Sequence, residues 1–134
     1  MKTTYKNFSI SSVAHLGEKV SSWDRLNSNY HKITVKNLDN GKKTSFDFWC
    51  PKAAPTFETE NDLLNAFYCF LSDADAGTYS LNEFYKEFCP DSDIEKIIQT
   101  WKECKKAYNK FYNLTGYSLD MLADLMYDLC EIAG

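Results

Sequence analysis

Residues 92–114, SDIEKIIQTWKECKKAYNKFYNL, are the most regularly patterned stretch of this 134-residue chain. Their apolar side chains recur at three- and four-residue steps, which places them on one face of a helix of about six turns. The side chains of this stripe are Ile94, Ile97, Ile98, Trp101, Cys104, Tyr108, Phe111 and Tyr112. The helix is expected to begin at a capping box formed by Ser92 and Glu95 and to end at a left-handed Gly116. So wide a stripe requires other elements to cover it.

Three further helices are expected around this one. Thr59 with Asp62, and Ser80 with Glu83, have the spacing of capping boxes, and Ser118 precedes a final apolar repeat. The apolar faces of these helices are expected to be Leu63, Leu64, Ala66, Phe67, Phe70 and Leu71; Leu81, Phe84, Tyr85 and Phe88; and Leu119, Leu122, Leu125, Met126, Leu129 and Ile132.

The clearest strand pattern precedes the helices. Residues 30–38 and 42–49 alternate in polarity on either side of Asp39-Asn40-Gly41, a typical hairpin turn. One face is expected to carry Ile33, Val35, Phe46 and Phe48, and the other His31, Lys36, Lys42 and Lys43. Residues 4–11 give a weaker signal for a third strand.

Strands followed by helices indicate an α+β fold, with a small antiparallel sheet of two or three strands packed against a bundle of about four helices. We expect a single domain over residues 1–134, with residues 1–58 mostly β and loop and residues 59–134 helical.

The two halves of the sequence differ in charge. Residues 1–58 contain nine Lys and Arg against five Asp and Glu, a net +4, whereas residues 59–134 contain six against fourteen, a net −8. An acidic helical half disfavours contact with phosphates through that surface and suits a basic partner. The alternative is that the acids serve only solubility.

Several classes of site are disfavoured by spacing. The five cysteines, which form no close pair, are expected to be reduced thiols rather than zinc ligands; they are Cys50, Cys69, Cys89, Cys104 and Cys130. His15 and His31 have no partner at catalytic or ligand spacing and are expected at the surface. The glycines form no phosphate-binding loop. We therefore expect no enzyme, metal or cofactor.

The loop at residues 73–83, DADAGTYSLNE, begins like a calcium-binding EF-hand loop. Its glycine is fifth and its glutamate eleventh, whereas the EF-hand requires the sixth and twelfth positions. An ordinary helix end at Gly77, followed by a helix start at Ser80, is the expected structure.

The N-terminus lacks the apolar segment of a secretory signal, and no apolar run approaches the ~20 residues of a membrane span. A cytoplasmic protein is expected.

Four segments, together with the proline-containing crossing between the first two, resemble a family of small uncharacterised proteins from tailed-phage and prophage genomes. They are FDFW (46–49), DLLNAFYCFLSDA (62–74), FYKEFCPDSDIEKIIQTWKECKK (84–106) and LMYDLCEIA (125–133). The resemblance extends over about residues 28–134 and departs before Ser92, where the family has Gly-Tyr-Asp in place of Cys89, Pro90 and Asp91. It identifies no catalytic residue. It implies a phage protein in the host cytoplasm that binds a host protein, an anti-CRISPR bound to a Cas effector being the sharpest form.

The acidic helical surface is the expected partner-binding site. Its candidate residues are Glu60, Asp73, Asp75, Glu83, Glu87, Asp91, Asp93 and Glu95. The first alternative is a single-strand nucleic-acid binder that uses the basic hairpin and its aromatics. Its candidate residues are Lys32, Lys36, Lys42 and Lys43. Against it, the hairpin aromatics can face the helices as core. The second alternative is a phage structural or assembly component.

Overall fold

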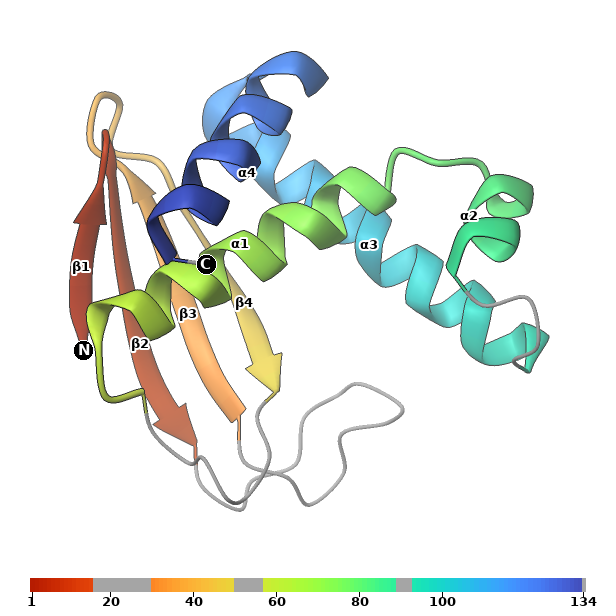
Figure 1. Ribbon diagram of the computed structural model, residues 1–134, viewed down its shortest axis with the longest axis horizontal. Coiled ribbons are helices and arrows are strands. Elements are labelled where there is room, and N and C mark those ends of the chain that lie inside the picture. Colours follow the sequence, from red (N-terminus) through yellow and green to blue (C-terminus); the bar gives the residue numbers. More distant parts are fainter. Residues whose placement is uncertain (16–29, 50–56, 89–92, 134) are drawn as a thin grey trace. The chain divides into compact units, whose positions relative to one another are not determined.

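The computed structural model describes residues 1–15, 30–49, 57–88 and 93–133 (Figure 1). Within these residues the fold is α+β, with a four-stranded antiparallel sheet followed by four helices. The strands are β1 (Lys2–Tyr5), β2 (Phe8–His15), β3 (Tyr30–Asn37) and β4 (Lys43–Trp49). The helices are α1 (Glu60–Ala76), α2 (Leu81–Phe88), α3 (Ile94–Thr115) and α4 (Leu119–Ala133).

The chain divides into two compact units. The sheet unit comprises Met1–Phe67 with Ile132–Gly134, and the helical unit comprises Tyr68–Glu131. Helix α1 begins in the first and ends in the second. The single domain expected from the sequence stays a prediction.

The sheet has one strand more than the two or three expected, in the order β1-β2-β3-β4. Residues 4–11, predicted as one strand, contain a hairpin in which Tyr5 pairs with Phe8. Lys6 turns the chain with a φ of 50°, in the left-handed region that glycine and asparagine usually occupy. This turn contains no glycine or proline, so the sequence pattern did not predict it.

Strand alternation separates an apolar from a polar sheet face. Ile33 and Val35 are fully buried, as predicted, while Lys32 and Lys36 are exposed. The prediction that His31 lies on the exposed face was wrong. Side chains two residues apart share a face, so His31 lies with Ile33, is buried, and stacks on Phe57 with ring centroids 3.9 Å apart.

The first half of α1 completes the core of the sheet unit. Its Phe67 contacts Tyr5 and Phe8, with ring centroids 6.4 and 5.6 Å away. The predicted capping box starts this helix: the Asp62 amide donates to Thr59 Oγ1 at 3.2 Å, and the Thr59 amide donates to the Asp62 carboxylate at 3.0 Å. The carboxylate also accepts from the Glu58 amide.

The start of α3 differs from the prediction, although its end does not. Asp93, not Ser92, is the N-cap, and its carboxylate accepts from the Glu95 amide at 2.8 Å. Adjacent Ser and Asp are equally good caps, so spacing alone did not choose between them. Ser92 itself lies outside the described residues. Gly116 ends α3 in the left-handed region, with φ 67°, as predicted.

The core of the helical unit uses a narrower face of α3 than the sequence suggested. Its buried side chains are Ile97, Cys104, Phe111 and Leu114. Ile94 and Tyr112, which were placed in the same stripe, are each about half exposed. An apolar stripe can be wider than the surface that covers it, and periodicity does not measure that difference.

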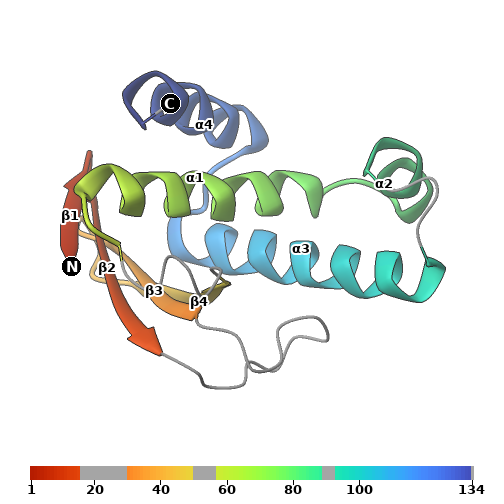
Figure 2. The ribbon, with the colours of Figure 1, turned by 60° about the horizontal axis from the view of Figure 1, so that its bottom comes forward.

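In the helical unit, α2 connects α1 to α3, and the end of α1 lies close to α3 (Figure 2). Ala76, Phe84, Ile97 and Cys104 form a small buried cluster there. A Cβ atom on Gly77 would overlap the Cys104 carbonyl group and lie 2.7 Å from the Lys105 nitrogen. The glycine therefore allows the end of α1 to approach the α3 backbone.

Among the described residues, no helix is long and apolar enough to cross a membrane.

Candidate interaction surfaces

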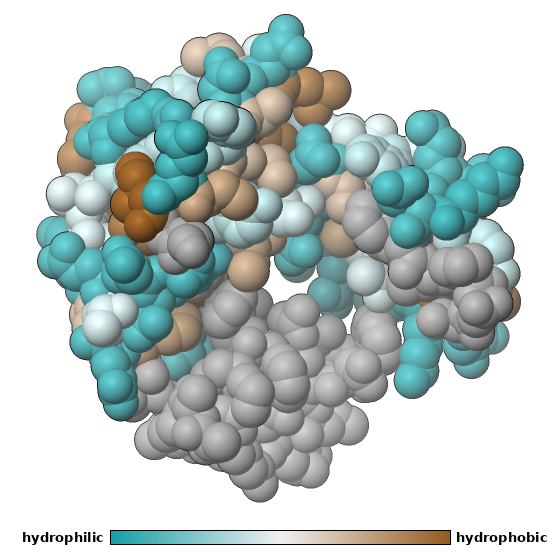
Figure 3. All heavy atoms as spheres, in the orientation of Figure 1, coloured by the Kyte–Doolittle hydropathy of each residue, from teal (hydrophilic) through white to brown (hydrophobic). Residues whose placement is uncertain are grey.

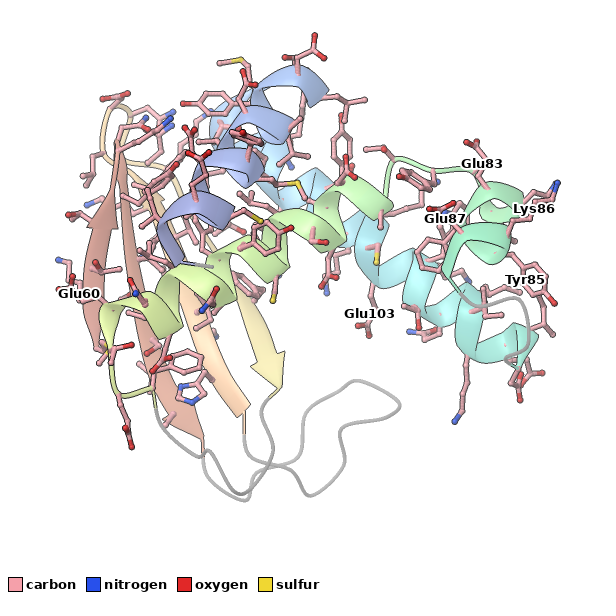
Figure 4. The ribbon with its side chains drawn as sticks, viewed as in Figure 1. Glu60, Glu83, Tyr85, Lys86, Glu87 and Glu103 are labelled. Carbon is pink, nitrogen blue, oxygen red and sulfur yellow. The ribbon has the colours of Figure 1, made fainter. Side chains whose placement is uncertain are left out.

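The predicted acidic residues are distributed over both units and several helices. Glu60 lies in the first turn of α1, within the sheet unit. Glu83 and Glu87 extend from α2 in the helical unit (Figure 4). Asp91 lies outside the described residues. The structure therefore gathers only part of the predicted set on one unit.

Two of these acids stabilise helix starts. Glu83 accepts a hydrogen bond from Ser80 Oγ at 2.8 Å and from the Ser80 amide at 3.4 Å, while its own amide donates to Ser80 Oγ. Asp93 caps α3. Both carboxylates also lie where a helix dipole favours negative charge. Their presence is explained without a partner, whereas Glu87 and Glu95 are exposed and remain available as contacts.

Asp73 and Asp75 occupy the last turn of α1. Burial raises the pKa of the Cys104 thiol to about 12, and the carboxylates of Asp73 and Glu103 add to the effect. Burial, and then Asp73, also raise the pKa of Cys69. Both thiols are therefore protonated near neutral pH and are not activated nucleophiles.

The loop after α1, whose sequence begins like an EF-hand, is held by hydrogen bonds to two backbone carbonyl groups. Thr78 Oγ1 donates to the Asp75 carbonyl oxygen at 2.7 Å, and the Gly77 amide donates to the Asp73 carbonyl oxygen at 2.9 Å. In the described ranges, no three His, Cys, Asp or Glu side chains gather in a way that could hold a metal ion.

Helix α4 carries an acidic row that was not among the predicted site residues. Asp120, Asp124 and Asp128 recur at four-residue steps, Glu131 continues the row, and residues 119–133 contain no Lys or Arg. Four-residue spacing places these carboxylates along one side of the helix. The same spacing is present in the sequence, but the apolar repeat of this helix has a similar periodicity and alone was used to predict it.

The predicted basic residues lie on the polar face of the sheet or beside it. Lys36 pairs directly with Lys43 on the neighbouring strand, and Lys32 lies four residues from Lys36 along β3. Lys42 lies in the turn, where its amide donates to Asn40 Oδ1. The register places Lys2 and several hydroxyl side chains on the same face, namely Thr4, Ser9, Ser11, Thr34 and Ser45.

Among the hairpin aromatics, Phe46 pairs with Ile33 on the apolar side of the sheet and is half-buried. The side chains of Tyr30, Phe48 and Trp49 lie outside the description. Apart from the exposed Val13, which pairs with Lys32, the described part of the polar face offers lysines and hydroxyls, which suit phosphate oxygens better than bases.

No protein-family model, no curated protein and no solved structure matches this chain.

Proposed function

We propose that this chain is a non-enzymatic interaction protein that binds a basic surface of a host nucleic-acid-handling or defence complex. A phage-encoded anti-CRISPR that occupies the nucleic-acid site of a Cas effector is the sharpest form of this proposal. The helical unit supports it through its charge, because residues 68–131 carry twelve Asp and Glu against six Lys. A basic site that normally holds phosphates attracts such a surface at long range and in the correct orientation.

The observation that carries the proposal is the acidic row of α4. Asp120 and Asp124 lie four residues apart on a helix without a cation, so they repel each other and reduce helix stability. The helix dipole favours negative charge in the first turn of a helix, and Asp124 lies beyond the first turn of α4. Capping and helix stability therefore do not explain the exposed Asp124, whereas an external cationic surface would.

A pull-down from the lysate of a host with an active CRISPR system tests the proposal, with and without nuclease treatment. Stoichiometric capture of a host protein that survives nuclease is expected. The variant Glu87→Lys/Glu95→Lys/Asp124→Lys should lose this capture, because it reverses three exposed carboxylates. It spares the caps at Glu83 and Asp93, so helicity and Tm should change little. Unchanged capture by this variant would contradict the proposal.

A second candidate function is contact with nucleic acid through the sheet face, favoured by the direct pairing of Lys36 with Lys43. Salt-dependent binding of a fluorescent oligonucleotide, lost in Lys36→Glu/Lys43→Glu, is the expected result for this function. In the pull-down, nuclease would then remove whatever was captured.

A further inference from the structure

A row of exposed apolar side chains runs along α4 beside its acids. Leu119, Ala123, Tyr127 and Cys130 recur at steps of four, four and three residues, so they lie along one side of the helix. All four are exposed, Leu119 by 47% and Tyr127 by 68%. The buried side of α4 is a different one, formed by Leu122, Leu125 and Leu129. Among the described residues, this helix therefore exposes apolar side chains on a face other than its buried one, and the Cys130 thiol at the end of that face interacts with Tyr68 of α1.

The acidic residues border this apolar row. Asp120 and Asp124 each follow a member of the row by one residue, which places them about 100° farther around the helix. Hydrophobic and hydrophilic surface accordingly lie side by side over α4 in the space-filling view (Figure 3). An apolar surface bordered by charges of one sign is typical of a surface that recognises a partner.

We infer that the outer face of α4 binds a basic amphipathic helix of the partner protein. The apolar side of that helix packs on the row from Leu119 to Cys130, and its Lys or Arg side chains face Asp120, Asp124 and Glu131. The row spans twelve residues, or about 16 Å, which matches three turns of a second helix. The inference rests on the proposed function and adds the kind of element that is bound.

Charge selects this occupant over others. A second copy docked through the same face would bring the acidic rows of two α4 helices together, because a two-fold contact uses the same patch twice. A nucleic acid or an anionic membrane would meet carboxylates at the border of the row. A basic helix satisfies the apolar row and the acidic border together.

Fluorescence anisotropy with defined peptides tests the inference. The probe is a fluorescein-labelled peptide of about 18 residues, with Leu on one helical face and Arg on its flanks. A scrambled peptide of the same composition has no apolar face. At an ionic strength of about 0.15 M, the full chain should bind the ordered peptide at least ~10-fold more tightly than the scrambled one.

The variant Leu119→Ser/Tyr127→Ser should weaken binding of the ordered peptide by ~10-fold or more, because both apolar anchors are removed. A matched control is Ile94→Ser/Tyr112→Ser, which removes two side chains of similar exposure, 53% and 51%, from α3. Asp124→Asn/Glu131→Gln should weaken binding less and reduce its dependence on salt.

Equal binding of the two peptides, or an equal loss in the α3 control, would overturn the inference. So would a dimer in light scattering that Leu119→Ser/Tyr127→Ser converts to a monomer, because the occupant would then be a second copy. If the Leu119→Ser/Tyr127→Ser variant still captures the host protein while the charge reversal does not, the proposed function stands and the α4 inference fails.

Discussion

The sheet unit and the helical unit differ in what they leave exposed. In the sheet unit, alternation along the strands separates the core from a polar face of lysines and hydroxyls. In the helical unit, α4 exposes both carboxylates and large apolar side chains such as Tyr127. Among the described strand residues of the sheet face, Val13 is exposed by 61% amid lysines and hydroxyls, whereas the outer face of α4 exposes two large apolar side chains, Leu119 and Tyr127, beside its acids. The contrast favours α4 as the recognition surface.

The two units also differ in charge and in how closely their elements approach. The sheet unit has nine Lys and Arg against seven Asp and Glu, while the helical unit has the excess of acids described above. Ring contacts of Phe67 join α1 to the sheet at ordinary packing distances. In the helical unit, Gly77 brings α1 against the backbone of α3. Core volume should therefore control the stability of the first unit, and backbone approach that of the second.

Phe67→Ala should have the largest effect on stability, because this fully buried ring contacts Tyr5 and Phe8. Removing a buried phenylalanine leaves a cavity and costs about 4 kcal/mol of the free energy of unfolding. Urea unfolding measures the loss, and hydrogen exchange should show the lost protection in β1 and β2. Phe67→Leu, which retains most of the volume, is the control and should cost much less. A loss below 1 kcal/mol for the alanine variant would show that α1 does not hold the sheet.

Gly77→Ala should cost about 2–3 kcal/mol, since one added methyl group overlaps the Cys104 carbonyl group and forces α1 and α3 apart. Gly41→Ala is an informative control because a Cβ there meets no atom within 4 Å, although its φ of 75° still favours glycine. Its cost should be only about 1 kcal/mol. Thermal unfolding of the two variants compares them, and equal losses would mean that conformation, not close approach, selects the glycine at position 77.

Thr59→Ala should cost about 1 kcal/mol through loss of the α1 cap, and the Asp62 carboxylate makes this cap dependent on pH. The backbone amides of Glu58 and Thr59 lower the pKa of Asp62 below its ordinary value of 3.8. A depressed pKa means that the stabilisation is complete above the unfolded-state pKa and is lost as pH falls through the folded-state value. The difference in urea midpoint between the wild type and Asp62→Asn should therefore shrink below about pH 4. A difference that stays constant from pH 6 to about pH 3 would exclude the charge as its source.

Local patterns in the sequence predicted much of the fold. The caps at Thr59, Ser80 and Ser118 and the stop at Gly116 were confirmed, because each depends on neighbours within four residues. The hairpin at Lys6 was not predicted, because lysine rarely adopts the left-handed conformation that this turn requires. The burial of His31 follows from its two-residue spacing to Ile33, whereas its polar side chain favours the surface, and here the spacing decides.

The candidate surfaces were harder to predict than the elements. The charge of each residue is visible in the sequence, but its structural use is not: Glu83 and Asp93 are occupied in caps. Exposed apolar side chains were also unpredictable. Leu119 and Ile132 were expected on the apolar face of α4, and only the packing of this helix shows that they are 47% and 54% exposed.

The smallest effect is expected at the Lys36–Lys43 pair, which places like charges directly opposite each other on adjacent strands. Such a pair costs a few tenths of a kcal/mol, so Lys43→Glu should raise stability by about 0.5 kcal/mol at low salt, and the gain should vanish at high salt. Lys42→Glu, in the turn outside the strand pairs, is the matched control and should change little. If the sheet face is only a solvated surface, Lys43→Glu should stabilise the protein without affecting any binding. If the same change also removes oligonucleotide binding, the like-charge pair is maintained for contact with phosphates, and the sheet unit has to be counted as a second recognition surface beside α4.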